Sequence, residues 1–387
     1  MINKKIVIGV SIFIFILSGY LSFSAFSGKP GVKFISPLGY KPPKNGTVVE
    51  TPAPEEPKTE ECPINGQMMT KTQKERWELR RPLGIAVENH KDARPQSGLS
   101  AADVVYEGVA ESGITRFLAV YYCQDGAPVG PVRSARVHFI RFLEEYGDYP
   151  LYAHVGGANT PGPADALGFI KELGWNLYND LNQFAVPFPY FWRDYERLPG
   201  RVTEHTVYTS TTKLWEYAKS KRELTNVDED GNEWDENFTK WKFADDAVLD
   251  KRGTVGNIKF GFWSTFADDN SVEWVYNKIT NSYTRKNGGA PHIDKNTGKA
   301  IEAKNIIVIF AKESDVDDGY EGGHILYKLI GSGDALIFQN GEAIKGEWSK
   351  EDEETRIVFT DATGKEISIV RGKVFVELLP IGNKVSY

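Results

Sequence analysis

The chain has 387 residues, with 41% hydrophobic and 12% aromatic side chains, which is typical of a globular protein long enough for two domains. Its formal net charge of −7 argues against a protein that coats nucleic acid, because such proteins need a broad basic face. The two cysteines, Cys62 and Cys123, form no C-x-x-C pair, which excludes a disulfide-rich scaffold and a structural zinc knuckle. A single bridge between them is conceivable.

The first predicted element is a membrane anchor, segment 1–28. Two lysines precede an uncharged apolar run, residues 6–26, which is long enough to span a bilayer. Positive charge before the run predicts that the N-terminus stays in the cytoplasm and that the rest is exported. A cleaved signal peptide is the alternative, because residues 22–24 resemble a small-residue cleavage site. The length of the run favours a single-pass anchor in the cell membrane with an extracytoplasmic body.

Segment 29–74 is predicted to be an extracytoplasmic linker. Eight of the 20 prolines of the chain fall between residues 27 and 63, and the stretch ETPAPEEPKTEE is acidic without apolar periodicity. Proline-rich segments of this kind are extended and semi-rigid.

Segment 75–225 is predicted to be an α/β domain, because strand and helix patterns alternate along it. Glycine-containing turns and loops separate the predicted elements, such as residues 111–113 between the second and third strands. We expect strands over 83–87, 103–109, 114–122, 150–155 and 203–210, and helices over 134–146, 163–173 and 211–221.

Beyond residue 225 the pattern changes. A polar, acidic stretch over 226–253 predicts a connection, and segment 254–387 contains almost only strand patterns. Asn340-Gly341 and Thr363-Gly364 are typical hairpin turns. The expected fold class is α+β, with a mixed N-terminal domain of a central sheet and flanking helices and a mainly antiparallel C-terminal domain.

The stretch GPVRSAR presents two arginines, Arg133 and Arg136, around Ser134 at the predicted start of a helix. Arginine binds carboxylate or phosphate in bidentate fashion, and a helix N-terminus favours an anion. On this local pattern alone, arginines that are solvated or paired with Glu107 or Glu111 explain the residues better than an anion site does.

Further candidates follow the ends of predicted strands, where ligands bind in open α/β sheets. Glu88, Asn89 and His90 follow the first strand, and His154 precedes Gly156 and Gly157 after another. His205 lies in the last strand of the domain. His154 and His205 are candidates for acid/base groups or metal ligands, but for any single histidine a hydrogen-bonded structural role is favoured. The aromatic loop 184–200 suits sugar or peptide recognition, or packs on its own domain.

No H-E-x-x-H, G-x-S-x-G or GK[ST] motif is present, so neither a metal nor a cofactor is expected. His292 and Asp294, two residues apart in a predicted turn, have a spacing that can bind metal, but surface turns often carry such pairs.

Long motifs resemble the YerB family of bacterial cell-envelope proteins, also called the DUF3048 family. They include GIAVENHKDARPQSGLSAADVVYEG, GPVRSAR, YAHVGGA and HTVYTS in the first domain and GSGDALIFQNGEAIKGEWSK in the second. The resemblance implies an exported two-domain protein of Gram-positive-type bacteria. It does not indicate which activity, if any, the protein has. Family members often resemble lipoproteins with a cysteine directly after the signal, whereas Cys62 lies far beyond the apolar run.

Several arginines and polar residues lie within these motifs at loops or strand ends, which is harder to attribute to packing and gives a ligand site equal weight with a structural role. The expected ligand-binding residues are Asn89, Arg94, Arg116, Arg133, Ser134, Arg136, Gly156, Gly157 and His205. The hypothesis is a tethered module that binds an anionic cell-wall or envelope polymer. A hydrolase or transferase using Glu107, Glu111 and His154 is the second hypothesis, and a scaffold for other envelope proteins is the third.

Overall fold

The computed structural model describes residues 17–18 and 56–387 of the chain. Residues 56–387 form one compact unit with a continuous hydrophobic core, separate from residues 1–55. Except for Leu17 and Ser18, which are helical, the predicted anchor over residues 1–28 lies outside the described residues. No helix within the described part of the chain is long and apolar enough to cross a membrane.

The first half of the compact unit contains the described helices of more than four residues. Its strands are β1 (Lys58–Glu61), β2 (Met68–Thr70), β3 (Leu83–Glu88), β4 (Val104–Glu111), β5 (Ile114–Tyr121), β6 (Leu151–His154), β7 (Asp180–Asn182), β8 (Phe191–Arg193) and β9 (Val207–Thr209). Its α-helices are α2 (Lys71–Trp77), α3 (Val137–Leu143), α4 (Ala166–Glu172) and α5 (Thr211–Arg222), and its 3-10 turns are η2 (Lys91–Ala93), η3 (Leu99–Ala101) and η4 (Thr203–His205).

The second half is almost entirely β-structure, as its sequence predicted. Short elements are β10 (Phe243–Ala244), η5 (Leu249–Lys251), α6 (Ala267–Asn270), β14 (Ala290–Pro291), β15 (Ile293–Asp294), β16 (Lys299–Ala300), β17 (Glu302–Ala303) and β23 (Ile369–Val370). Longer strands are β11 (Asn257–Phe260), β12 (Val272–Asn277), β13 (Ser282–Asn287), β18 (Asn305–Val316), β19 (His324–Lys328), β20 (Gly331–Gln339), β21 (Glu342–Lys350), β22 (Val358–Asp361) and β24 (Val374–Pro380).

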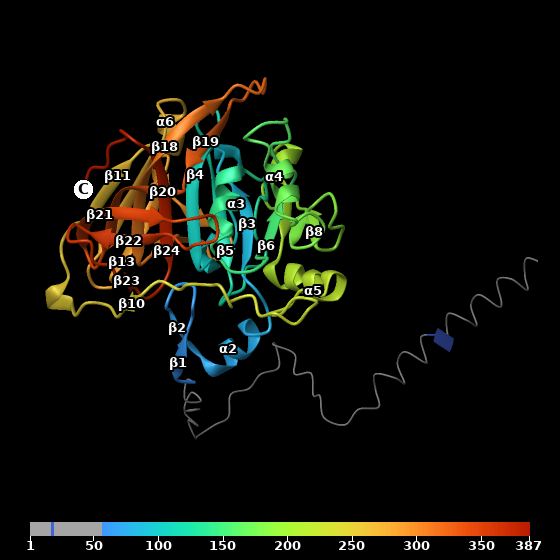
Figure 1. The fold of residues 1–387 in the computed structure, drawn as a ribbon, viewed down its shortest axis with the longest axis horizontal. Helices are drawn as coiled ribbons and strands as arrows, with labels where there is room; N and C mark the ends of the chain where they lie inside the picture. Colours follow the sequence, from blue (N-terminus) through green and yellow to red (C-terminus); the bar gives the residue numbers. More distant parts are fainter. Residues whose placement is uncertain (1–16, 19–55) are drawn as a thin grey trace, which may run out of the picture. The chain divides into compact units, whose positions relative to one another are not determined.

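One central sheet runs through both halves (Figure 1). Its strand order is β22-β21-β20-β18-β24-β4-β5-β3-β6-β7, with β19 paired to β18. β24 is parallel to both β18 and β4, and it joins the strands of the two halves. The fold is therefore α+β, as predicted, and the segments predicted as separate domains share one sheet and one core within the compact unit.

Alternate residues of β4 show how the central sheet is covered on both faces. Tyr106 stacks on Phe142 of α3 with ring centroids 4.4 Å apart. Its neighbour Glu107 points the opposite way, as strand geometry requires, and forms an ion pair with Arg285 of β13. The sheet thus lies between the helical layer of α3 and the second sheet β11-β12-β13-β14. In the view of Figure 1, α3 lies in front of the central strands.

The folded body begins earlier in the chain than the predicted end of the linker at residue 74. Residues 58–70 form the β1–β2 hairpin, and α2 begins at Lys71, with a capping box between Thr70 and Gln73. Buried side chains hold this segment to the body, and Cys62 is joined to Cys123 in a disulfide. The bridge that the sequence left open is therefore formed.

The loop before α3 differs from the predicted helix over 134–146, because α3 begins only after Arg136. Residues 133–135 are extended since their backbone bonds to the ends of two strands: Arg133 N–H donates to Ala86 at 2.9 Å and Ala135 N–H to Gly156 at 2.9 Å. The predicted strand over 203–210 is also shorter. His205 lies in η4, and only Val207–Thr209 pair as β9.

Candidate functional site

Five predicted site residues meet in one cavity of about 200 Å³, which we call the arginine pocket. It is lined by Glu111, Arg133, Ser134, Arg136, Gly157, Ala158, Asn159, Thr160, Tyr320 and His324. Glu111 ends β4, residues 157–160 follow β6, and Tyr320 and His324 come from the β18–β19 hairpin. The pocket lies beyond the carboxyl ends of β4 and β6, where the sequence placed a ligand site.

Glu111 is the negative centre of the pocket. Its carboxylate forms ion pairs with Arg136 and, at 3.5 Å, with Arg116. Burial alone would raise the pKa of Glu111, but the charges of Arg116, Arg136 and Arg133 outweigh burial and lower the pKa to about 2. Glu111 is therefore ionised at neutral pH and is unsuited to donate a proton there.

Arg136 and Arg116 are held by the protein itself. Arg136 donates to the carbonyls of Ala110 and Ala135 at 3.1 and 2.9 Å and to Glu111. Arg116 is nearly fully buried and donates to the carbonyl of Ser134 at 2.8 Å. Burial, together with the neighbouring Arg136, lowers the pKa of Arg116 to about 10, so it stays cationic. The guanidinium groups of both residues are therefore used in hydrogen bonds within the protein, and they stabilise the wall of the pocket.

Arg133 is the arginine that faces the pocket. Its side chain is 26% exposed, and its Nε lies 3.0 Å from Glu88 in an ion pair that is not a hydrogen bond. No other partner holds its guanidinium within residues 56–387. Among these directly paired groups, three arginines, 116, 133 and 136, stand against two carboxylates, Glu88 and Glu111, an excess of one positive charge. The pocket also borders the pair of His324 and Asp318, which are 2.6 Å apart.

Glu88 connects Arg133 to His205. The Glu88 carboxylate lies 2.7 Å from Nδ1 of His205. His205 is one of the residues that the sequence predicted to bind the ligand. Burial would raise the pKa of Glu88, but the hydrogen bond from His205 and the charge of Arg133 lower it. His205 is buried and lies behind Arg133, so it positions Glu88 and does not line the pocket.

His154 and Gly156 support the pocket from the end of β6. His154 is fully buried, with Nε2 2.7 Å from Asp180 and Nδ1 2.7 Å from the carbonyl of Gly156. Gly156 has a φ of +59°, a left-handed conformation that a side chain would strain. The histidine holds the glycine turn in place and has no access to a substrate.

Three predicted site residues belong to a different, buried network between the central sheet and the second sheet. Glu107 bonds to Asn89 and Thr115 at 2.9 and 2.6 Å and pairs with Arg285. Arg94 donates to Asn89 at 3.1 Å and to residues 269 and 270. These side chains join the two halves of the compact unit and lie away from the arginine pocket.

The sequence did not identify Tyr320 or His324 as site residues, whereas Glu88, the partner of Arg133, was among the candidates after the first strand. Tyr320 stacks on His324 at 4.3 Å and donates to Glu111 at 3.3 Å, which closes one side of the pocket. Glu88 follows the first strand beside Asn89, so its position at a strand end was an available signal. Tyr320 lies about 200 residues from the arginine loop, and no pattern in the sequence indicated that it reaches the pocket.

His90, Asp92 and His205 are the residues best placed to hold a metal ion. One ligand atom of each lies within 4.8 Å of the others, and Glu88 orients His205 through Nδ1. Asp92 is also 3.3 Å from Arg201, which a metal would have to displace. His292, by contrast, bonds to Arg285 and Gln96, so it pairs with no metal-ligating neighbour. Cys62 and Cys123 are joined in the disulfide and offer no thiolate.

The aromatic loop 184–200 is divided between core and surface. Phe191 is buried, whereas Phe184, Phe188 and Tyr195 are exposed by more than half. The ring of Phe184 lies against Gly156, within about 3.3 Å of where a Cβ would stand. One exposed aromatic face therefore borders the loop that lines the arginine pocket.

Comparison with known families matches two models to this chain. The N-terminal domain of the DUF3048 proteins of unknown function matches residues 69–225, and the C-terminal domain of the same proteins matches residues 263–376. The resemblance noted in the sequence is thereby confirmed.

Two individual proteins are similar to this chain. A putative lipoprotein, YerB of Bacillus subtilis (strain 168), is 32% identical over 302 residues, which cover 78% of this chain and 82% of that protein. The crystal structure of the YerB protein from Bacillus subtilis matches with a TM-score of 0.67 at 28% identity, covering 85% of this chain and 100% of the other.

Proposed function

This chain belongs to the DUF3048 family, and from that premise we propose that it is a membrane-associated extracytoplasmic protein that binds an anionic envelope polymer through Arg133. The group recognised is a carboxylate or a phosphate of the cell wall.

Two observations support a place outside the cytoplasm. A buried disulfide is typical of proteins that fold in an oxidising compartment, and the similar YerB protein is described as a lipoprotein. Cys62 carries no free thiol for a lipid because it is bonded to Cys123. Attachment by the apolar run over residues 6–26 therefore suits this chain better than a lipid at Cys62.

The single observation that carries the binding proposal is the state of the Arg133 guanidinium. It faces a cavity, makes one ion pair without a hydrogen bond, and belongs to a cluster with one excess positive charge. An anion at this point would gain charge-assisted hydrogen bonds from Arg133 without displacing an existing one. The exposed ring of Phe184 beside Gly156 offers an apolar surface for the rest of the ligand.

Retention on isolated cell-wall sacculi tests this function with the compact unit Glu56–Tyr387, whose core is complete. We expect wild type to be retained and to be eluted by inorganic phosphate. Arg133→Ala removes the cation that faces the pocket and should weaken retention about tenfold or more.

Arg76→Ala is the matched control, because Arg76 is an exposed arginine on α2 away from the pocket. It should be retained like wild type. Equal retention of Arg133→Ala and wild type, with both variants folded, would refute the proposal.

The hydrolase or transferase alternative has no supporting geometry. Glu107 and His154 are fully buried, and Glu111 is neutralised by arginines, so none is free to transfer a proton. The scaffold alternative acts through the β-rich second half and needs a contiguous apolar patch there, whereas exposed apolar residues of that half such as Ile279 and Ile381 lie on separate segments. The exposed rings of Phe184, Phe188 and Tyr195 belong to the first half. We therefore propose neither.

A further inference from the structure

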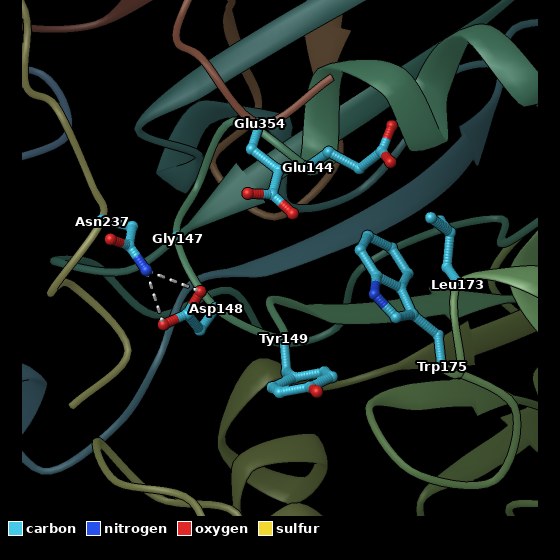
Figure 2. A pocket seen from close by; sticks show the side chains of 8 residues that line it. All are labelled: Glu144, Gly147, Asp148, Tyr149, Leu173, Trp175, Asn237 and Glu354. Atoms are coloured by element: carbon cyan, nitrogen blue, oxygen red, sulfur yellow. Dashed lines mark hydrogen bonds between the residues drawn. The ribbon is translucent and has the colours of Figure 1, made fainter. Parts of the chain in front are cut away.

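A second cavity, of about 190 Å³, lies at the other end of the helical layer (Figure 2). We call it the indole pocket. It is lined by Glu144, Gly147, Asp148, Tyr149, Leu173, Trp175, Asn237 and Glu354.

The indole pocket is separate from the arginine pocket. Glu144 is the C-cap of α3 and Leu173 is the C-cap of α4, whereas the arginine pocket lies before the first residues of both helices. The seven residues of α3 place the two cavities roughly 10 Å apart along its axis. No residue lines both.

The charged side chains that line the indole pocket are all acidic. Glu144 is held by Arg141 at 3.2 Å, and Asp148 accepts a hydrogen bond from Asn237 at 3.4 Å. The carboxylate of Glu354 has no partner within the described residues 56–387, and its loop is fixed instead by Asp352, which accepts from the backbone of Glu354 at 3.1 Å. An anionic ligand is excluded by this lining.

Trp175 supplies the opposite kind of group, a hydrogen-bond donor. The side chain is only 5% exposed, and its backbone is fixed by a bond from Trp175 N–H to Ile170 at 3.0 Å. Its indole N–H makes no hydrogen bond within the described residues 56–387, and it is not among the fully buried unpaired atoms, so it opens into the pocket and its solvent. Figure 2 shows the nitrogen edge of the indole turned toward the space between Glu354, Asp148 and Tyr149.

Tyr149 forms an aromatic wall in a strained conformation. Its φ of +49° is unfavourable for a residue with a bulky side chain. Arg81 stabilises this turn by donating to the carbonyls of Asp148 and Tyr149 at 3.2 and 3.3 Å, and the ring of Tyr149 stands edge-on to Tyr178 at 5.0 Å. The ring is therefore held beside the cavity and remains exposed.

We infer that the indole pocket binds a neutral sugar ring. A sugar hydroxyl both donates and accepts, so it satisfies the free carboxylate of Glu354 and the free indole N–H of Trp175 together. The C–H face of a sugar packs on Tyr149 and Leu173. An ammonium group offers only donors and would leave the indole N–H without an acceptor.

The experiment follows the indole ¹H–¹⁵N resonance of Trp175 in Glu56–Tyr387 during titration with tetra-N-acetylchitotetraose. The nine tryptophans give nine such signals, and Trp175→Phe identifies the one that disappears. We expect a saturable shift with a dissociation constant of about 1 mM. Glu354→Gln should weaken binding about fivefold, because a charge-assisted hydrogen bond becomes a neutral one.

Glu351→Gln is the control, since Glu351 is an exposed neighbour on the same loop that does not line the pocket. It should bind like wild type. No shift of the Trp175 signal, or a shift with butylammonium chloride but not with the sugar, would overturn the inference. Arg133→Ala should leave the sugar titration unchanged, so failure here and failure at the arginine pocket are distinguishable.

Discussion

Each of the two pockets at the ends of α3 contains a glutamate, and the pKa of the carboxyl group is shifted in opposite directions in the two places. At the arginine pocket, Glu111 has its pKa lowered to about 2 by three arginines that outweigh burial. At the indole pocket, burial raises the pKa of Glu144 to about 7, with Arg141 opposing it too weakly. The number of nearby cations, and not burial alone, decides the charge of each carboxyl group.

This difference also divides the two pockets by the ligands they suit. The arginines leave a positive excess where Arg133 faces the solvent. At the indole pocket, Arg141 pairs with Glu144 from outside the lining, and no arginine or lysine lines the cavity. One end of the helical layer therefore suits an anion and the other suits hydroxyl groups.

The largest expected effect comes from Glu111→Gln, which removes the charge that neutralises Arg116 and Arg136. Leaving buried cations without their partner should lower the free energy of unfolding by about 3–5 kcal/mol at pH 7. Chemical denaturation measures it, with Glu321→Gln on the β18–β19 hairpin as an exposed control. A loss below about 1 kcal/mol would mean that Glu111 is not needed to compensate the buried charges of Arg116 and Arg136.

Glu144→Gln should change the pH dependence of stability in the opposite sense to a salt-bridged acid. The folded-state pKa is about 7 against an ordinary value of 4.5, so the folded protein holds a proton that the unfolded chain releases. This contribution to stability is present below pH 4.5 and is lost as the pH rises to 7, by about 2 kcal/mol between pH 5 and 7.

The measurement for Glu144 is the free energy of unfolding at pH 5 and pH 7, for wild type and the glutamine variant. Wild type should lose about 2 kcal/mol more than Glu144→Gln over this interval. Equal slopes would place the pKa of Glu144 near its ordinary value and remove the contrast with Glu111.

Salt should distinguish the two binding events. Retention through Arg133, which is partly exposed, should weaken several-fold between about 50 and 500 mM sodium chloride because ions screen the attraction. Sugar binding at the indole pocket should stay within twofold over the same range. Salt-independent retention would show that Arg133 does not act through its charge.

The smallest expected effect is that of Tyr320→Phe. Its hydroxyl donates to Glu111 at 3.3 Å near the surface, so the variant should lose less than about 1 kcal/mol of unfolding free energy. Denaturation under the conditions used for Glu111→Gln measures it. A loss as large as that of Glu111→Gln would make Tyr320, and not the arginines, the main partner of the carboxylate.

The sequence predicted the strands of the first half well because buried runs such as residues 83–87 are bounded by clear turn residues. The sequence also placed Arg133 and Arg136 at a helix start and Gly157 after a strand, and these three residues line one pocket in the structure. The alternative reading, arginines paired with a nearby glutamate, describes Arg136 and Glu111. The sequence could not predict that the carbonyls of Ala110 and Ser134 also hold Arg136 and Arg116, because those contacts depend on how the backbone folds. Glu107 and Asn89 were misplaced for a related reason: a sequence does not say which face of a strand a second sheet will cover.

The position of β24 determines when the central sheet can finish folding during synthesis of the chain. β24 is the last strand of the described chain, yet it lies between β18 and β4. About 250 residues separate the end of β5 from β24, which at ordinary synthesis rates is a delay on the order of 10–50 s. During that interval β4 has one open edge, so a nascent chain must keep this edge from other partners until its final strand is made.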